Sequence, residues 1–133
     1  MHVVLMDVDY TLYPKGTGPF VEVSRNIEAY VRRRLGLDQT QTKALRESYI
    51  ARFGSTLGGL MHEHAVDPLE FLAYVHDVPV EDMLRDDGRL QETLTALHLP
   101  LIAFSNGSTA YILRVLRTLG VAGGDAFLRT LRS

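Results

Sequence analysis

The stretch LMDVDYTLYP, residues 5–14, places two carboxylates one residue apart directly after an apolar run. The run VVLM at residues 3–6 shows no alternation of polar and apolar residues. This is typical of a strand covered on both faces in a parallel sheet, although a short buried helix fits the same pattern. Ligands of open parallel sheets bind beyond the carboxyl ends of the strands. Asp7 and Asp9 therefore occupy positions where a binding site is expected.

The spacing of the two acids favours a metal site. Side chains two residues apart in an extended chain point the same way, so the two anions repel each other. A divalent cation relieves that repulsion, and hard carboxylate oxygens suit Mg²⁺. One carboxylate can then attack phosphorus while the other moves protons. The alternative is a pair of loop acids that cap the turn into Tyr13 and Pro14, and for an isolated D-x-D that alternative is the commoner one.

A second apolar run, LIAF at residues 101–104, is followed by Ser105, Asn106 and Gly107. These residues supply a hydroxyl, an amide and a flexible backbone just before a predicted helix, and that combination suits phosphate oxygens. A plain N-cap loop is the alternative. Each segment alone indicates little, but together the two strand ends predict a phosphate site.

Almost everything between the two apolar runs predicts helix. The apolar residues recur at helical spacing, and Gly and Pro stand at the expected ends. Three predicted helices cover residues 21–35, 39–53 and 56–65. Two more begin near Asp67 and near Asp87, and a last one, after the second apolar run, covers 108–119. The order is therefore strand, helical block, strand, helix.

Composition excludes several classes of protein. The chain of 133 residues is 46% hydrophobic and 23% charged, as in an ordinary globular domain. It has no cysteine, which excludes thiol catalysis, thiolate metal sites and disulfides. The net charge of −2 and the absence of a basic patch do not suggest nucleic-acid binding. No signal peptide or apolar membrane span is visible, so a cytoplasmic location is expected.

The two motifs resemble a known family. DVDYTLY at residues 7–13 resembles the first motif of the haloacid dehalogenase (HAD) superfamily, D-x-D-x-[TV]-L, and LIAFSNGS at 101–108 resembles its second. The resemblance is closer to the pyrimidine 5′-nucleotidase-like branch, whose cap is similar to TLGGLMHEHAVDPLEFLAYVHDV at 56–78. The match extends from about Val3 to Gly120.

The resemblance implies an α/β fold with a HAD-like Rossmannoid parallel sheet, incomplete in this chain, and an inserted helical cap. Residues 1–15 and 88–133 would form the partial core, and residues 16–87 the cap. The implied activity is that of a phosphatase that works through an aspartyl phosphate. Nucleoside 5′-monophosphates would be the substrates, with pyrimidines such as UMP and CMP preferred.

The resemblance also implies roles for single residues. Asp7 would attack phosphorus, and Asp9 would protonate the leaving oxygen and then activate water. Mg²⁺ would bind Asp7, the backbone carbonyl of Asp9 and a phosphate oxygen. Ser105 would hydrogen-bond the phosphoryl group, with Asn106 nearby.

The sequence departs from the family pattern in two respects. Tyr10 stands where the branch usually has Asn. More seriously, the family has a third motif with a Lys and a fourth with acids, whereas the only lysines here are Lys15 and Lys43, and Asp125 is the only acid after Ser105. A truncated chain, a fragment, a frameshift and a partner chain that supplies the rest all remain open. An incomplete core predicts low activity and self-association.

Other interpretations compete with this one. The chain fits a non-catalytic helical interaction module or an inactive truncated fragment, a haloacid dehalogenase that attacks carbon through Asp7, or a sugar-phosphate phosphatase. Asp9 argues for phosphoryl transfer, because dehalogenation needs no protonated leaving oxygen. His62 and His64 are two apart on a predicted helix and face different directions, so a polar surface is favoured over a metal site.

Overall fold

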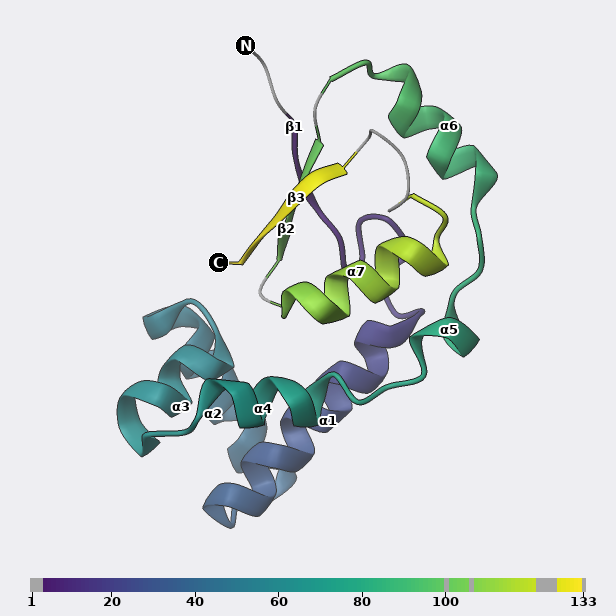
Figure 1. Cartoon of the computed structure of the whole chain (residues 1–133). Coiled ribbons are helices and arrows are strands. Elements are labelled where there is room, and N and C mark those ends of the chain that lie inside the picture. The colour runs from purple at the N-terminus through teal and green to yellow at the C-terminus, as the bar shows by residue number, and fades with distance from the viewer. Residues whose placement is uncertain (1–3, 100, 106, 122–126, 133) are drawn as a thin grey trace. The chain divides into compact units, whose positions relative to one another are not determined.

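The computed structural model describes residues 4–99, 101–105, 107–121 and 127–132. Three strands, β1 (Val4–Asp7), β2 (Leu101–Ser105) and β3 (Phe127–Arg132), form a parallel sheet in the order β1-β2-β3. The seven helices of the described residues are α1 (Pro19–Leu35), α2 (Gln39–Phe53), α3 (Thr56–His64), α4 (Pro68–Val75), α5 (Val80–Met83), α6 (Gly88–Ala96) and α7 (Thr109–Thr118). Figure 1 shows these elements along the chain.

The predicted fold class, α/β with a HAD-like Rossmannoid parallel sheet and an inserted helical cap, is wrong. Helices make up most of the described chain, and the sheet consists of three strands of only 4, 5 and 6 residues. A Rossmannoid core requires a larger sheet with helices between successive strands. Here the described residues between β1 and β2 form six successive helices, α1 to α6, with turns and loops between them, so the chain is mainly a helical protein with a small parallel sheet.

The two apolar runs lie side by side in the sheet, as a shared phosphate site at their two ends requires. β1 and β2 are parallel neighbours, with Leu5 opposite Ile102 and Asp7 opposite Phe104. Parallel strands bring their carboxyl ends to one edge of the sheet. Asp7 is the last residue of β1 and Ser105 is the last residue of β2, so both lie at that edge. β3 was not predicted, because its six residues include two arginines and a threonine and lack a continuous apolar run.

The chain divides into two compact units. The first contains Met1–Val21 and Pro79–Ser133, and the second contains Glu22–Val78. The sheet, α5, α6 and α7 belong to the first unit, whereas α2, α3, α4 and nearly all of α1 belong to the second. The functional division into a core and a cap with bounds at 16–87 stays a prediction.

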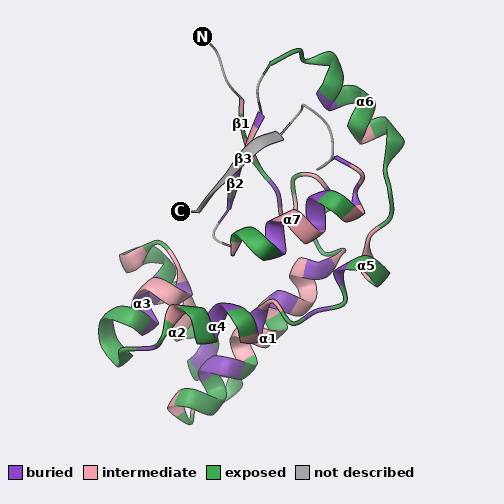
Figure 2. Ribbon diagram, in the orientation of Figure 1, coloured by how far each residue is buried: buried purple, intermediate pink, exposed green. Residues whose placement is uncertain are grey.

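Each unit has its own buried residues. In the first unit, α7 buries one face, and the sheet contributes Leu101 and Ala103, which are 0% exposed. Figure 2 shows this division of α7 into a buried and an exposed side. In the second unit, the buried residues are mainly aromatic and β-branched, among them Tyr30, Val31, Tyr49, Phe71 and Val75.

Local sequence explains most helix ends. Asp38 caps α2 in a reciprocal capping box with Gln41, and the left-handed Gly54 ends that helix. Asp67 caps α4, with Pro68 at the first helical position, as the sequence predicts. Ser55 caps α3 by accepting the N–H of Gly58 at 2.9 Å, and the helix ends one residue before the predicted 65. Among the described residues, no helix has both the length and the apolar character that crossing a membrane requires.

Candidate functional site

Three of the four predicted site residues, Asp7, Asp9 and Ser105, lie at the end of β1, in the turn after it and at the end of β2. We call the group formed by Asp7, Asp9, Tyr13, Ser105 and Tyr111 the acid site. All five residues belong to the first unit. They come from the end of β1 and the turn after it, from the end of β2, and from the first turn of α7.

Asp7 ends β1 and is exposed. Its Oδ1 accepts the N–H of Val8 at 2.9 Å, and its Oδ2 accepts the hydroxyl of Thr11 at 3.2 Å. Val8 is fully buried, and its carbonyl accepts the N–H groups of Thr11 and Leu12 at 3.2 and 2.9 Å. This turn anchors the carboxylate, so Asp7 is both fixed and accessible to solvent.

Asp9 lies in the turn and is partly buried. Its Oδ1 accepts two phenolic hydroxyls, one from Tyr13 and one from Tyr111 at 3.0 Å. Burial raises the pKa of the Asp9 carboxyl, the two tyrosine hydrogen bonds lower it by less, and the negative charge of Asp7 raises it further. The two acids therefore differ in environment, although they are adjacent in the motif.

The two tyrosines are themselves held in a protonated state. Burial is the main cause that raises the pKa of both the Tyr13 and the Tyr111 hydroxyl, and the charge of Asp9 raises each pKa further. Neither hydroxyl competes with Asp9 as an acid or base near neutral pH. Both act as hydrogen-bond donors.

Ser105 is buried, and its Oγ accepts the N–H of Gly107 at 3.0 Å. A hydroxyl that accepts one bond can still donate its hydrogen, so Ser105 has the chemistry to bind a phosphate oxygen. Ser108 caps α7 by accepting the N–H of Tyr111 at 3.2 Å. Asn106, the other predicted substrate-binding residue, lies outside the described residues.

Tyr10, which replaces the branch's usual Asn, adopts the left-handed conformation with φ of 61°. Asn and Gly enter this region more readily than an aromatic residue does. The Tyr10 ring makes edge contacts with Phe20 and Tyr13, with centroids 5.0 and 6.0 Å apart. The departure from the family pattern thus places a strained aromatic residue directly beside Asp9.

The donor set fits Mg²⁺ only in part. Asp7 offers a carboxylate, and Asp9 offers a backbone carbonyl and a carboxylate whose Oδ1 is already engaged. Within the described ranges, no three His, Cys, Asp or Glu side chains gather closely enough to hold a metal ion. Mg²⁺ commonly binds through one or two carboxylates, several waters and a substrate phosphate, so Asp7 and Asp9 suit an ion held together with substrate.

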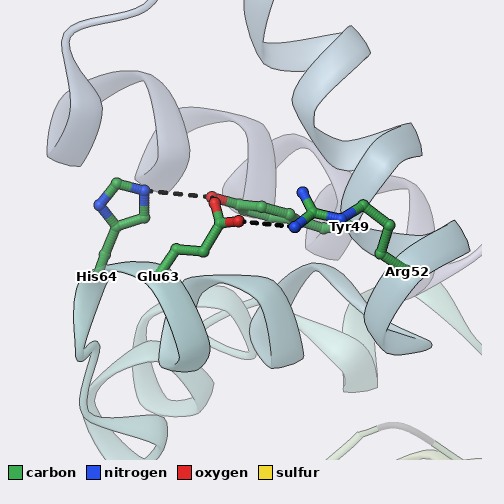
Figure 3. A network of polar contacts seen from close by, with 4 residues as sticks. All are labelled: Tyr49, Arg52, Glu63 and His64. Atoms are coloured by element: carbon green, nitrogen blue, oxygen red, sulfur yellow. Dashed lines mark hydrogen bonds and ion pairs between the residues drawn. The ribbon is translucent and has the colours of Figure 1, made fainter.

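A second polar cluster lies in the helical unit. Tyr49 and Arg52 of α2 meet Glu63 and His64 of α3 (Figure 3), and we call these four residues the α2–α3 network. The Tyr49 hydroxyl donates to Glu63 Oε2 at 2.8 Å and lies 3.2 Å from His64 Nε2, while Arg52 Nη2 lies 3.0 Å from Glu63 Oε1. His62 instead lies against the ring of Phe53. The two histidines therefore have different partners.

Sequence reasoning missed Tyr13 and Tyr111 as site residues. Tyr13 had a local signal, since it follows Asp9 by four residues within the first motif. Tyr111 had none, because it lies 102 residues from Asp9 and reaches it only through the packing of α7.

No protein-family model matches the chain. The chain is 27% identical over 129 residues to Phosphate metabolism protein 8 of Saccharomyces cerevisiae (strain ATCC 204508 / S288c), a similarity that covers 90% of this chain. The chain spans 40% of the length of that relative. The resemblance to the HAD superfamily therefore stays a prediction.

Proposed function

We propose that this chain carries the nucleophile and general acid of a magnesium-dependent phosphatase of the HAD type, with nucleoside 5′-monophosphates as its substrates. The observation that carries the proposal is the unequal pair of acids. Asp7 is exposed at a strand end, whereas Asp9 is partly buried and held by two tyrosine hydroxyls. Two neighbouring carboxyl groups in different environments are the arrangement that lets one act as nucleophile and the other as acid.

The chemistry follows from these environments. A carboxylate oxygen of Asp7 bonds to phosphorus as the bond from phosphorus to the ester oxygen breaks. Asp9, whose pKa burial raises, donates its proton to that oxygen, and an alcohol leaves. Water then attacks the phosphorus of the aspartyl phosphate, Asp9 takes up its proton, and inorganic phosphate and the free Asp7 carboxylate are released.

Ser105 supports the same reaction from β2. Its hydroxyl would donate to a phosphoryl oxygen, and the N-terminus of α7 begins four residues later. Mg²⁺, held by the Asp7 carboxylate and the Asp9 backbone carbonyl, would neutralise charge on the phosphoryl oxygens. A cytoplasmic location belongs to the same proposal.

The substrate class has two supports besides the site. Residues 56–78 resemble the cap of pyrimidine 5′-nucleotidases, and the yeast relative is named for phosphate metabolism. A screen of phosphate esters in the presence of Mg²⁺ tests this part. A preference for sugar phosphates over every nucleotide would reject it.

Trapping the phosphorylated protein tests the reaction itself. The chain is mixed with p-nitrophenyl phosphate and Mg²⁺, and the reaction is quenched with acid. The mass of the peptide that contains Asp7 is then measured by mass spectrometry. We expect a hydroxylamine-sensitive phosphoryl group on the wild type and none on Asp7→Asn or after removal of Mg²⁺ with EDTA. Equal labelling of Asp7→Asn would reject Asp7 as the nucleophile, whereas no labelling of the wild type would favour a non-catalytic interaction module.

A further inference from the structure

We propose that Tyr13 and Tyr111 are positioning residues that hold the Asp9 carboxyl by Oδ1 and so assign Oδ2 to the substrate. This inference rests on the proposed function, because it concerns how the acid of that reaction is oriented. It assigns a role to two residues, Tyr13 and Tyr111, to which the motif resemblance gives no function.

The geometry of the two hydrogen bonds carries the inference. Both phenolic hydroxyls approach the same oxygen, Oδ1, from different parts of the chain. A carboxyl oxygen has two lone pairs, and two hydroxyl donors occupy both of them. Oδ2 is then the oxygen suited to contact a leaving group. Rotation of the carboxyl by half a turn would exchange the oxygens only if both hydrogen bonds broke.

Both phenol rings are fixed by close packing. Tyr13 and Tyr111 are 6% and 2% exposed. A methyl group on Gly18 would lie 2.7 Å from Cε2 of Tyr13, and one on Gly107 would lie 3.0 Å from Cδ1 of Tyr111. Gly18 also has a φ of +71°, which a side chain would strain. The backbone at Gly18 thus approaches Tyr13 as closely as only glycine permits, and the backbone at Gly107 packs tightly against Tyr111, which limits where the two hydroxyls can lie.

The two tyrosine hydrogen bonds to Asp9 connect the two predicted motifs in space. Tyr13 belongs to the turn after β1, and Tyr111 lies in the first turn of α7, directly after the β2 motif. Asp9 is therefore oriented by the same helix whose cap residue, Ser108, accepts the Tyr111 N–H at 3.2 Å. Such support from a second element is what holds a catalytic group in a productive geometry.

The test compares leaving groups. An alkyl or nucleoside leaving group needs a proton from Asp9, whereas p-nitrophenolate is stable enough to leave without one. For Tyr111→Phe, and separately for Tyr13→Phe, we expect phosphoryl transfer from a nucleoside monophosphate to slow about tenfold, a part of the roughly hundredfold or more that a general acid supplies. Transfer from p-nitrophenyl phosphate should change less than about twofold, since it makes little use of the acid.

Tyr49→Phe is the matched control. It removes a buried phenol hydroxyl that also donates to a carboxylate, Glu63, but in the other unit. We expect it to leave the ratio of the two rates unchanged. Equal slowing of both esters by the Tyr111 and Tyr13 variants would overturn the inference, because a merely structural loss does not depend on the leaving group.

A double variant separates this inference from the proposed function. If the tyrosines act through Asp9, Tyr111→Phe should cause no further slowing in an Asp9→Asn background. Further slowing there would overturn the positioning role. If Asp7→Asn abolishes transfer while both tyrosine variants behave like the wild type on both esters, the positioning role alone fails. If Asp7→Asn transfers phosphate normally, the proposed function fails, and the positioning role fails with it.

Discussion

The acid site and the α2–α3 network both contain a buried tyrosine that donates its hydroxyl to a carboxylate. The pKa values of the two carboxyl groups are nevertheless shifted in opposite directions. Burial raises the pKa of Asp9 despite two tyrosine hydrogen bonds. The hydrogen bond from Tyr49 lowers the pKa of Glu63, and Arg52 lowers it further. The tyrosine hydrogen bonds lower the pKa at both carboxylates, so the direction of the net shift depends on whether the carboxylate keeps its access to water and has a cation beside it.

This contrast distinguishes the proposed catalytic site from a structural ion pair. Glu63 is exposed, and Arg52 compensates its charge, so the network joins two helices without storing an unfavourable charge. Among the described residues, the groups that shift the pKa of Asp9 include no cation but do include a second carboxylate, Asp7, that disfavours its charge. Perturbed acids of the second kind cluster at active sites.

The largest expected difference between the two carboxylates is in catalysis. Asp9→Asn removes the proposed general acid, so we expect turnover of nucleoside monophosphates to fall by roughly a hundredfold to ten-thousandfold. Glu63→Gln removes a carboxylate of the α2–α3 network and should leave turnover unchanged. Steady-state release of phosphate, measured on both variants at one pH, decides the point. Equal losses would show that the contrast between the two carboxylates has no catalytic meaning.

Gly59→Ala should break the network by packing alone. A methyl group at this position in α3 would overlap the ring of Tyr49, which is 0% exposed. We expect a loss of about 1–3 kcal/mol in the free energy of unfolding, the usual range for overpacking a filled core. Urea unfolding followed by circular dichroism measures it. Gly88→Ala is the matched control, because a methyl group there meets no atom within 4 Å.

The pH dependence of stability should have opposite signs at the two carboxylates. The folded pKa of Asp9 lies above the unfolded value near 3.8, so its contribution to stability falls as pH rises from that value through the folded pKa. Asp9→Asn should therefore gain stability relative to the wild type as pH rises, and match it most closely in acid.

Glu63 gives the opposite expectation. Its folded pKa lies below the unfolded value near 4.5, so its contribution is present above that value and is lost as pH falls through the folded pKa. Glu63→Gln should be less stable than the wild type at neutral pH and approach it in acid. Thermal unfolding of the three proteins between pH 3 and pH 8 tests both signs, and parallel curves for the two variants would contradict the contrast.

How far the sequence predicts these sites depends on the range of the contacts. The parallel pairing of β1 with β2 is consistent with the two apolar runs, but their exact register is not encoded there, since Asp7 lies opposite Phe104, one residue before Ser105. The predicted fold class, an incomplete Rossmannoid sheet with an inserted helical cap, does not follow, because it came from a family resemblance carried by two short motifs, whereas most of the described chain is helical. The hydrogen bond from Tyr111 to Asp9 joins residues 102 positions apart, and no local pattern in the sequence encodes it. The bond from Tyr49 to Glu63 likewise depends on how α2 packs against α3.

The smallest expected effect concerns the cation that distinguishes the α2–α3 network from the acid site. Arg52 lies 3.0 Å from Glu63, and its guanidinium lies over the ring of Phe53 at 4.8 Å. Arg25 and Glu22 form a matched pair within α1 at 2.6 Å, with the Arg25 side chain 71% exposed. Exposed ion pairs contribute little and are screened by salt, so Arg52→Met should cost only a small fraction of the Gly59→Ala loss. The loss of unfolding free energy for Arg52→Met should still exceed the loss for Arg25→Met, because Arg52 links two helices and also covers an aromatic ring. Urea unfolding at low and at high salt measures both variants. A loss for Arg52→Met that persists undiminished at high salt would mean that packing against Phe53, and not charge, is what Arg52 contributes to the network.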